Sequence, residues 1–317
     1  MSFISGKYTP TIAVLIPCYN EQQTIAKVVD DFARELPDAA IYVYDNNSTD
    51  DTAQIASQHG AIVRHETRQG KGNVMRQMFR DIDADYYVLV DGDDTYPALA
   101  VHALLVPLMS GDADMTVGDR LSNGSYTVEN KREFHNFGNN LVSKMINLLY
   151  HCKVADPMSG YRAFTKTFVK CFPILAQGFE IETSLTIHSV DKNWRMVEVP
   201  IDYRDRPAGS FSKLSTFRDG FRVLRTIMSL FKDYKPLRFF AVVGLILVVI
   251  GLILGISVAI EFFQTGYVQR FPTLFVAIGL ILCGLLSVSV GLILDTVVKN
   301  GRNQYELDVM RVYDEDR

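Results

Sequence analysis

The sequence lacks the glycine fingerprints of two common phosphate-binding folds. No G-x-G-x-x-G follows the first apolar stretch, and no G-x-x-x-x-G-K-S/T occurs anywhere in the 317 residues. Those patterns bring backbone amides against a dinucleotide or against the phosphates of ATP and GTP. Their absence disfavours both the dinucleotide-binding fold and the P-loop.

Cysteine and histidine are also scarce, and neither forms a recognisable ligand group. The four cysteines, Cys18, Cys152, Cys171 and Cys283, make no close pair, and the six histidines show no zinc spacing. We therefore expect free thiols, as in a reducing compartment, and no zinc centre. The formal net charge of −4 also argues against nucleic acid as a partner, because proteins that bind the phosphate backbone are normally basic.

Two long apolar runs near the C-terminus are the most distinctive feature of the composition. Residues 239–260 and 271–294 contain no charged side chain, and each run exceeds the roughly 20 residues that cross a hydrocarbon core. A buried hairpin in a soluble protein is the weaker alternative, because a core helix is seldom apolar on every face. We therefore predict two transmembrane helices.

Basic residues flank these runs: Lys232, Lys235 and Arg238 precede the first, and Lys299 and Arg302 follow the second. The positive-inside rule places both flanks in the cytoplasm. Residues 1–10 lack the charged segment and apolar stretch of a secretory signal. The sequence thus predicts a multi-pass protein of the cell membrane, inner or plasma, with its first domain and both termini cytoplasmic.

Upstream of the runs, apolar stretches of strand length alternate with segments of helical period. Strands are expected at residues 11–17, 40–44, 61–66, 86–90, 113–118 and 194–204, and helices at 24–36, 71–82, 97–109, 137–150 and 180–190. A further helix should end near His59, behind a capping box formed by Ser48 and Asp51. This alternation is typical of an α/β domain with a mainly parallel sheet.

Segment 216–231 has apolar residues on one helical face and Arg218, Arg222 and Arg225 on another. This pattern favours an amphipathic helix in the membrane interface over a helix that faces a core. The chain therefore divides into a cytoplasmic α/β domain at 1–214, an interfacial region at 215–237, two spans with a short extracytoplasmic loop at 238–296, and a cytoplasmic tail at 297–317.

Acidic side chains follow several of the expected strands, where open α/β sheets bind their ligands. Asp91 and Asp93 come directly after the fourth strand, separated by one glycine. Two such carboxylates can turn toward one point, and their oxygens suit Mg²⁺ or Mn²⁺ that bridges to substrate phosphates. A simple turn is the alternative. The metal is favoured because Asp94 adds a third carboxylate, whose repulsion a cation would relieve.

The RQGKG stretch supplies Arg68 and Lys71 just before an expected helix. Backbone amides and the helix dipole favour anions at such a position. A capped surface loop explains the same residues equally well. Only the surrounding motifs favour the anion site.

Seven motifs in fixed order resemble the family-2 glycosyltransferases, which have the GT-A fold. They are IPCYNE from Ile16, DNNSTDDT from Asp45, GKG from Gly70, DGDDTY from Asp91, DPMSGYRAF from Asp156, GFEIE from Gly178 and YRDRPAGSFSKL from Tyr203. The last three match the branch that acts on polyprenyl phosphates, which includes dolichyl-phosphate mannose synthases and the bacterial GtrB-like enzymes. The match covers residues 11–214, and the two apolar runs match the GtrB-like members.

The resemblance implies a role for each matched residue. Pro17, Tyr19 and Glu21 would line the nucleotide pocket, Asp45 would read base or ribose, and Asp91 and Asp93 would touch the metal and the diphosphate. Asp156 would face the acceptor as a base or orienting group, and Arg206, Ser210 and Lys213 would lie in a mobile loop that meets phosphates. Archaeal mannose synthases carry a metal-binding glutamine where Thr95 stands here, which puts a third protein ligand in doubt.

The implied reaction is inverting transfer of a hexose from a nucleotide sugar to undecaprenyl phosphate or a similar lipid. Lys71, Arg206 or Lys213 could stabilise the leaving diphosphate together with the metal. UDP-glucose is placed ahead of UDP-N-acetylglucosamine and GDP-mannose as donor. A homo-oligomer is conceivable, since the polar tail 300–317 could pack on a neighbouring subunit.

Two other functions compete with this interpretation. A processive polysaccharide synthase normally carries Q-x-x-R-W, whereas the only tryptophan here, Trp194, precedes Arg195 in KNWRM. A non-catalytic scaffold for a flippase would not need the intact acidic motifs. Both therefore rank below the transferase.

Overall fold

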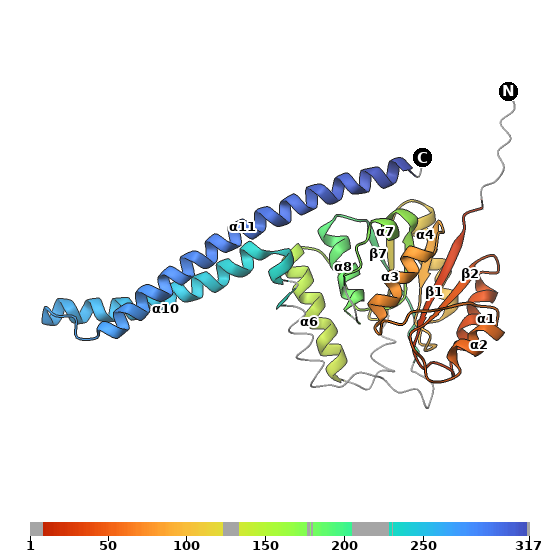
Figure 1. The fold of residues 1–317 in the computed structure, drawn as a ribbon, viewed down its shortest axis with the longest axis horizontal. Coiled ribbons are helices and arrows are strands. Elements are labelled where there is room, and N and C mark those ends of the chain that lie inside the picture. Colours follow the sequence, from red (N-terminus) through yellow and green to blue (C-terminus); the bar gives the residue numbers. More distant parts are fainter. Residues whose placement is uncertain are drawn as a thin grey trace, which may run out of the picture. The chain divides into compact units, whose positions relative to one another are not determined.

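The computed structural model describes residues 9–122, 133–175, 178, 180–204, 228–229 and 231–315 (Figure 1). The chain forms two compact units. The first comprises residues 1–223 and 309–317 and contains the β-sheet, and the second comprises residues 224–308 and contains long apolar helices. Each unit has its own internal packing.

A seven-stranded sheet forms the centre of the first unit, in the order β3-β2-β1-β4-β6-β5-β7. The strands are β1 (Ile12–Cys18), β2 (Ala40–Asp45), β3 (Ile62–His65), β4 (Tyr86–Leu89), β5 (Met115–Asp119), β6 (Arg162–Thr165) and β7 (Met196–Pro200). Only β6 runs antiparallel to its neighbours, β4 and β5, among the described strands. The predicted α/β domain with a mainly parallel sheet is confirmed.

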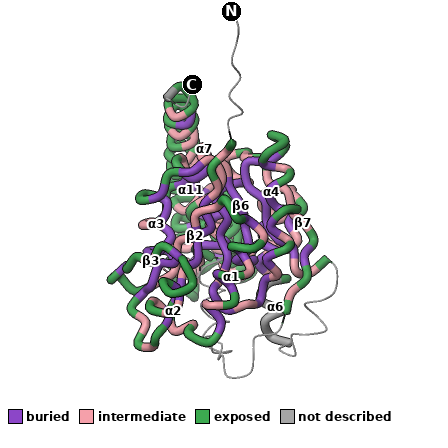
Figure 2. Tube along the Cα trace, turned by 90° about the vertical axis from the view of Figure 1, so that its right-hand side faces the viewer, coloured by how far each residue is buried: buried purple, intermediate pink, exposed green. Residues whose placement is uncertain are grey.

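Helices cover both faces of this sheet, and each face has its own apolar core. On one face lie α1 (Ile25–Glu35), α2 (Thr52–Gln58) and α4 (Val101–Met109); on the other lie α3 (Lys71–Asp81), α7 (Lys166–Cys171) and α8 (Ile181–Asp191). Side chains of β1 alternate between the cores, because successive residues of a strand point to opposite faces. Val14 and Ile16 enter one core, and Ala13 and Leu15 enter the other. The continuous apolar run of β1 is thus buried on both sides. Figure 2 shows in purple the buried segment of the neighbouring strand β2.

Several elements differ from the sequence-based expectation. β6 and α7 were not predicted, because their sequences, RAFT and KTFVKC, contain no run of more than two apolar residues. The expected capping box is wrong: Asp51 is the N-cap of α2 without a side-chain bond, and the Ser48 hydroxyl instead accepts from the Asn20 backbone amide. The helix at 97–109 begins with a 3₁₀ turn, Ala98–Ala100, and the helix at 137–150 becomes α6, Glu133–Tyr150.

Two helices dominate the second unit: α10 (Pro236–Thr265) and α11 (Phe271–Glu315). Both are long and apolar enough to cross a membrane, as expected for 239–260 and 271–294. α11 extends beyond its apolar run, so most of the tail expected at 297–317 is helical. Most of the interfacial helix expected at 216–231 lies outside the described residues.

Glycines let α10 and α11 pack at backbone distance. A Cβ atom at Gly284 would lie 2.7 Å from the carbonyl oxygen of Gly244 and 2.6 Å from a methyl of Val248. A Cβ atom at Gly251 would lie 2.9 Å from the carbonyl oxygen of Ala277. Small residues that allow such close approach are typical of helix pairs in membranes.

Substitution of these glycines tests the helix contact. Gly284→Ala should lower the free energy of unfolding by about 1–3 kcal/mol, because the added methyl overlaps the opposite backbone. Gly279→Ala is the matched control, since a Cβ atom there meets nothing within 4 Å. That change should stabilise α11 by up to about 1 kcal/mol through helix propensity. Thermal unfolding of the full chain in detergent measures both, and equal stabilisation by the two changes would contradict the packing.

Candidate active site

The carboxyl ends of β1, β2 and β4 meet at one edge of the sheet. β1 pairs with β2 on one side and with β4 on the other, so the order of connection reverses here. Open α/β sheets bind ligands at such a switch point. The structure brings the predicted donor residues to the strand ends and loops of this edge: Pro17, Tyr19, Glu21, Asp45, Lys71, Asp91 and Asp93.

The loops after β1 and β2 are tied together by hydrogen bonds. The Asn20 backbone amide donates to Ser48 Oγ at 2.9 Å, and Asn20 Oδ1 accepts from the Thr49 amide at 2.8 Å. The Glu21 amide donates to Thr52 Oγ1 at 2.8 Å. These bonds fix the backbone of the predicted nucleotide pocket.

Asp45 and Tyr19 stand at this edge with different exposure. Asp45 is only 5% exposed, and its carboxylate accepts from the Ser48 amide at 3.2 Å and lies 3.3 Å from His65 Nδ1. Tyr19 is 36% exposed. The Tyr19 ring is therefore open to a ligand, whereas Asp45 first serves to order the loop after β2.

Asn46 positions the RQGKG loop and was missed by the sequence analysis. Its Nδ2 donates to the carbonyls of Glu66 and Arg68 at 2.7 and 2.9 Å, and its Oδ1 accepts from the Gly70 amide at 2.7 Å. Gly70 adopts a φ of 128°, which only glycine reaches readily. This clamp sets the point at which α3 begins, and hence the place of Lys71.

Lys71 forms ion pairs with two carboxylates. Its Nζ contacts Asp91 Oδ1, and it lies 2.6 Å from Glu182 Oε1, in the first turn of α8. Burial disfavours the ammonium, but Asp91 and Glu182 outweigh that effect and raise the pKa of Lys71 above its usual value. Lys71 is therefore a permanent cation at the strand ends. Glu182 was not singled out from the sequence, although it lies in the GFEIE motif.

Asp91 is held from the opposite side by the backbone of Gly160. The antiparallel register sets Leu89 opposite Arg162, and continuing it by two residues sets Asp91 opposite Gly160. A Cβ atom at Gly160 would collide with the Asp91 carboxylate. The Asp91 side chain remains 29% exposed, so it can still reach a ligand.

Asp93 and Asp94 have separate surroundings. Asp93 is 3% exposed and accepts from Thr95 Oγ1 at 2.6 Å. Asp94 lies 2.7 Å from Lys27 Nζ. The repulsion from a third carboxylate, which favoured a metal in the sequence analysis, is therefore relieved by a lysine. Thr95 orients Asp93 through its hydroxyl hydrogen bond.

The donor set at Asp91 and Asp93 is compatible with a divalent cation. The described residues contain no group of three or more His, Cys, Asp or Glu side chains that could hold a metal. Mg²⁺ is commonly bound by one or two carboxylates, with substrate phosphates and water completing the shell. Carboxylate oxygens at i and i+2 fit that requirement, so the protein would supply part of the shell and a diphosphate the rest.

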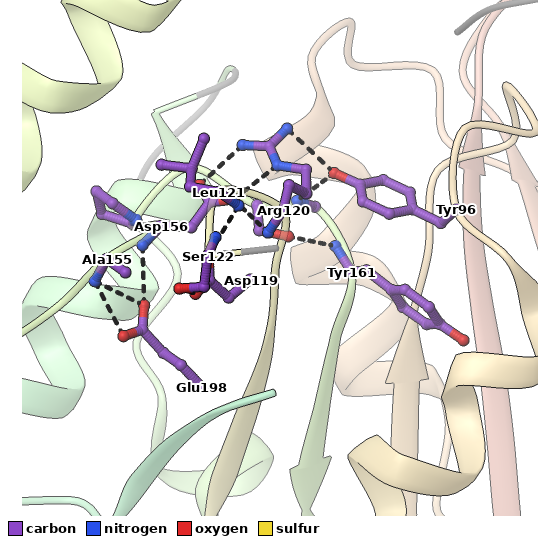
Figure 3. Close-up of polar contacts among 12 residues, drawn as sticks. Tyr96, Asp119, Arg120, Leu121, Ser122, Ala155, Asp156, Tyr161 and Glu198 are labelled. Carbon is purple, nitrogen blue, oxygen red and sulfur yellow. Dashed lines mark hydrogen bonds and ion pairs between the residues drawn. The ribbon is translucent and has the colours of Figure 1, made fainter. Parts of the chain in front are cut away.

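A second charged cluster surrounds Asp156 (Figure 3). Asp156 is fully buried, and its two oxygens accept from Arg120 Nε at 2.7 Å and Nη2 at 2.8 Å. The Arg120 guanidinium also donates to Tyr96 Oη at 3.4 Å and lies over the Tyr203 ring. The Gly160 amide donates to the same Tyr96 oxygen at 3.0 Å, which links this cluster to Asp91.

The surroundings of Asp156 favour an orienting role over that of a base. Burial alone would raise its pKa, but Arg120 overrides this effect and holds the pKa below its usual value. A buried carboxylate that accepts two bonds from a guanidinium is a poor proton acceptor and a good support for that guanidinium. Arg120 was missed from the sequence because no motif marked it.

The predicted phosphate-binding loop is not described by the structure. Arg206, Ser210 and Lys213 lie outside the described residues. Their roles stay predictions, as do those assigned to the described site residues: Pro17, Tyr19, Glu21, Asp45, Lys71, Asp91, Asp93 and Asp156.

Comparison with known proteins agrees with this geometry. The family described as Glycosyl transferase family 2 matches residues 13–172. Glycosyltransferase AglJ of Haloferax volcanii is 34% identical over 254 residues, which cover 79% of this chain and 82% of AglJ. Protein RfbJ of Shigella flexneri is 53% identical over 120 residues, 38% of this chain and 93% of RfbJ. The chain therefore belongs to glycosyltransferase family 2.

Two further matches concern substrate and fold. The dolichyl-phosphate hexose transferase of Haloferax volcanii is 29% identical over 217 residues, 68% of this chain and 92% of that protein. The crystal structure of glucosyl-3-phosphoglycerate synthase from Mycobacterium tuberculosis with Mn²⁺, UDP-glucose and phosphoglyceric acid covers 70% of this chain and 79% of its own, with a TM-score of 0.55 and 24% identity. The fold is thus of the GT-A type, and the protein is a glycosyltransferase.

Removal of Arg120 tests the charge balance around Asp156. Arg120→Met should lower the free energy of unfolding at pH 7 by about 3–5 kcal/mol, because a buried carboxylate loses its partner. In the wild type the folded pKa of Asp156 lies below the unfolded one, so this stabilisation is present at neutral pH and lost in acid. In the variant, Asp156 takes up a proton first as the pH falls, and the difference between the proteins narrows.

Urea unfolding in detergent between pH 4 and pH 7 measures this effect. Arg195→Met is the matched control, because Arg195 makes the same kind of bidentate pair with Asp114 but has a 56% exposed side chain. The control should cost less, because Asp114 is 6% exposed and Asp156 is not exposed at all, and because the lost guanidinium was already in contact with water. Equal losses for both variants at every pH would contradict the assignment.

Proposed function

We propose that the protein transfers a hexose from a nucleotide sugar to a polyprenyl phosphate at a membrane surface, with inversion at the anomeric carbon. The observation that carries the proposal is the meeting of Lys71, Asp91 and Asp93 at the sheet's switch point, in a chain with two helices long enough to cross a membrane. The relative named dolichyl-phosphate hexose transferase supports a lipid phosphate as acceptor.

The donor would lie along the carboxyl ends of β1, β2 and β4. Pro17, Tyr19 and Glu21 would line the nucleotide pocket, with Asp45 at the base or ribose. Asp91 and Asp93 would hold Mg²⁺ or Mn²⁺ on the diphosphate, and Ser210, Arg206 and Lys213 would approach it from the loop after β7. When bound, the cation would supply charge stabilisation for the departing nucleoside diphosphate. Lys71 supplies a fixed positive charge at the same place.

The acceptor needs little help to react. A monoester phosphate has a second pKa of about 6 and is therefore already an anionic nucleophile at neutral pH. A general base is therefore dispensable, which agrees with the burial of Asp156 against Arg120. We assign Asp156 to orienting Arg120 beside the acceptor.

We also propose which sugar donor and which lipid acceptor the protein uses. UDP-glucose is the first candidate donor, supported by the UDP-glucose complex of a protein with the same fold. Undecaprenyl phosphate is the first candidate acceptor, supported by a match to the undecaprenyl-phosphate mannosyltransferase of Micrococcus luteus. With α10 and α11 spanning the cell membrane and their basic flanks in the cytoplasm, the donor would be taken from the cytosol.

Lipid labelling tests the proposed function directly. Purified protein with Mg²⁺ or Mn²⁺, undecaprenyl phosphate and radiolabelled UDP-glucose, UDP-N-acetylglucosamine or GDP-mannose should move label into the lipid phase. Omitting the metal or adding a chelator should abolish the transfer. No lipid product from any of the three donors would overturn the proposal.

The two acidic groups should differ in importance. Asp93→Asn should lower kcat by about 100-fold or more, because several kcal/mol of charge stabilisation depend on the metal. Asp156→Asn should cost less, because the acceptor is already ionised. Initial rates at saturating donor, with thermal stability recorded for each variant, measure the ranking. A larger loss for Asp156→Asn would show that Asp156 acts as a base.

A further inference from the structure

Lys71 is enclosed by carboxylates from two different elements. It is the first residue of α3, Asp91 follows β4, and Glu182 lies in the first turn of α8. The side chains of Lys71 and Glu182 are 9% and 7% exposed, whereas that of Asp91 is 29% exposed. A ligand can therefore approach this group at Asp91, which is partly exposed, and not at Glu182, which is buried.

The carboxylates around Lys71 carry more negative charge than Lys71 neutralises. Lys71 contributes one positive charge, and Asp91, Glu182 and the neighbouring Asp93 contribute three negative charges. Asp94 and Asp156 do not enter this count, because Lys27 and Arg120 compensate them. Within these four side chains two negative charges remain. The buried Arg162 guanidinium also interacts with Glu182, so a divalent cation would act mainly on Asp91 and Asp93.

Cation binding at Asp91 creates a conflict that Glu182 can resolve. The ammonium of Lys71 contacts the same carboxylate that would hold the cation, and like charges at such a distance repel. Without a second anion, Lys71 would be left buried and unpaired, which is costly. Glu182 already lies 2.6 Å from Lys71 Nζ and can keep the ammonium in place when Asp91 turns to the cation.

We propose that Glu182 is a positioning residue that holds Lys71 beside the cation, so that both positive charges act on one diphosphate. This inference rests on the proposed function. The N-terminal turn of α8 favours a negative charge at Glu182. An ammonium has more donors than its bonds to Asp91 and Glu182 use, so Lys71 can also donate to a phosphate oxygen.

Two substitutions should move cation affinity in opposite directions. Glu182→Gln removes one negative charge and leaves Lys71 paired only through Asp91, so Mn²⁺ should bind about tenfold more weakly, the effect of one charge-assisted bond. Lys71→Met removes the competitor for Asp91, so Mn²⁺ should bind about tenfold more tightly. A loss of fold would weaken binding in both variants and cannot produce opposite signs.

The measurement is a titration of the full chain in detergent, with free Mn²⁺ followed by electron paramagnetic resonance in the absence and presence of UDP. Asp114→Asn is the matched control, because Asp114 is an equally buried carboxylate paired with Arg195, just before the start of β5 and at the opposite edge of the sheet. It should leave Mn²⁺ binding within about twofold of wild type. In the transfer assay, excess Mn²⁺ should restore part of the Glu182→Gln activity and none of the Lys71→Met activity.

The outcomes separate this inference from the proposed function. Normal Mn²⁺ binding by wild type and by Glu182→Gln would overturn the role of Glu182 alone. Weaker binding by Lys71→Met would do the same, because it would make Lys71 a support of Asp91 and not its competitor. No Mn²⁺ binding by wild type, with or without UDP, would overturn the metal site and this inference with it.

Discussion

Charge compensation at the carboxyl edge of the sheet is the constraint on which the site depends. The strand order brings Asp45, Asp91 and Asp93 together, and so many carboxylates are stable near a core only if each has a partner. Lys71 pairs with the open carboxylate Asp91 and with Glu182, Thr95 orients Asp93, and Arg120 neutralises Asp156. These residues come from α3, α8, the segment after β4 and the segment after β5. The proposed cation and diphosphate would bind in this same arrangement.

The elements that could be predicted from the sequence are those marked by a long apolar run or by regular spacing of apolar residues. β1 is a continuous apolar run buried on both faces, and α10 and α11 contain runs too long and too apolar for an ordinary core. β6 was not predicted because its sequence, RAFT, contains no run of more than two apolar residues, yet its antiparallel register places Gly160 opposite Asp91. Such a short strand is fixed by its neighbours in the sheet and not by its own pattern.

The site was predictable to the extent that its residues follow strands. Asp91 and Asp93 come directly after β4 and could be chosen on that ground. Asn46 and Arg120 also come directly after strands, β2 and β5, but their roles could not be predicted. Each of them, like Glu182, acts through a partner far away in the chain, and spacing carries no information about such pairs. Asp156 was predicted to be a base or an orienting group. Its burial against the Arg120 guanidinium favours the orienting role.

The central claim is that a divalent cation joins Asp91 and Asp93 to the diphosphate of a donor while Lys71 stays on Glu182. Anomalous diffraction at the manganese edge, from crystals grown with Mn²⁺ and UDP, tests it most directly. The account predicts a single peak within about 2.5 Å of oxygens from both aspartates and from UDP, with Lys71 Nζ still bonded to Glu182. A peak on other side chains, or UDP bound at the strand ends with no peak, would contradict it.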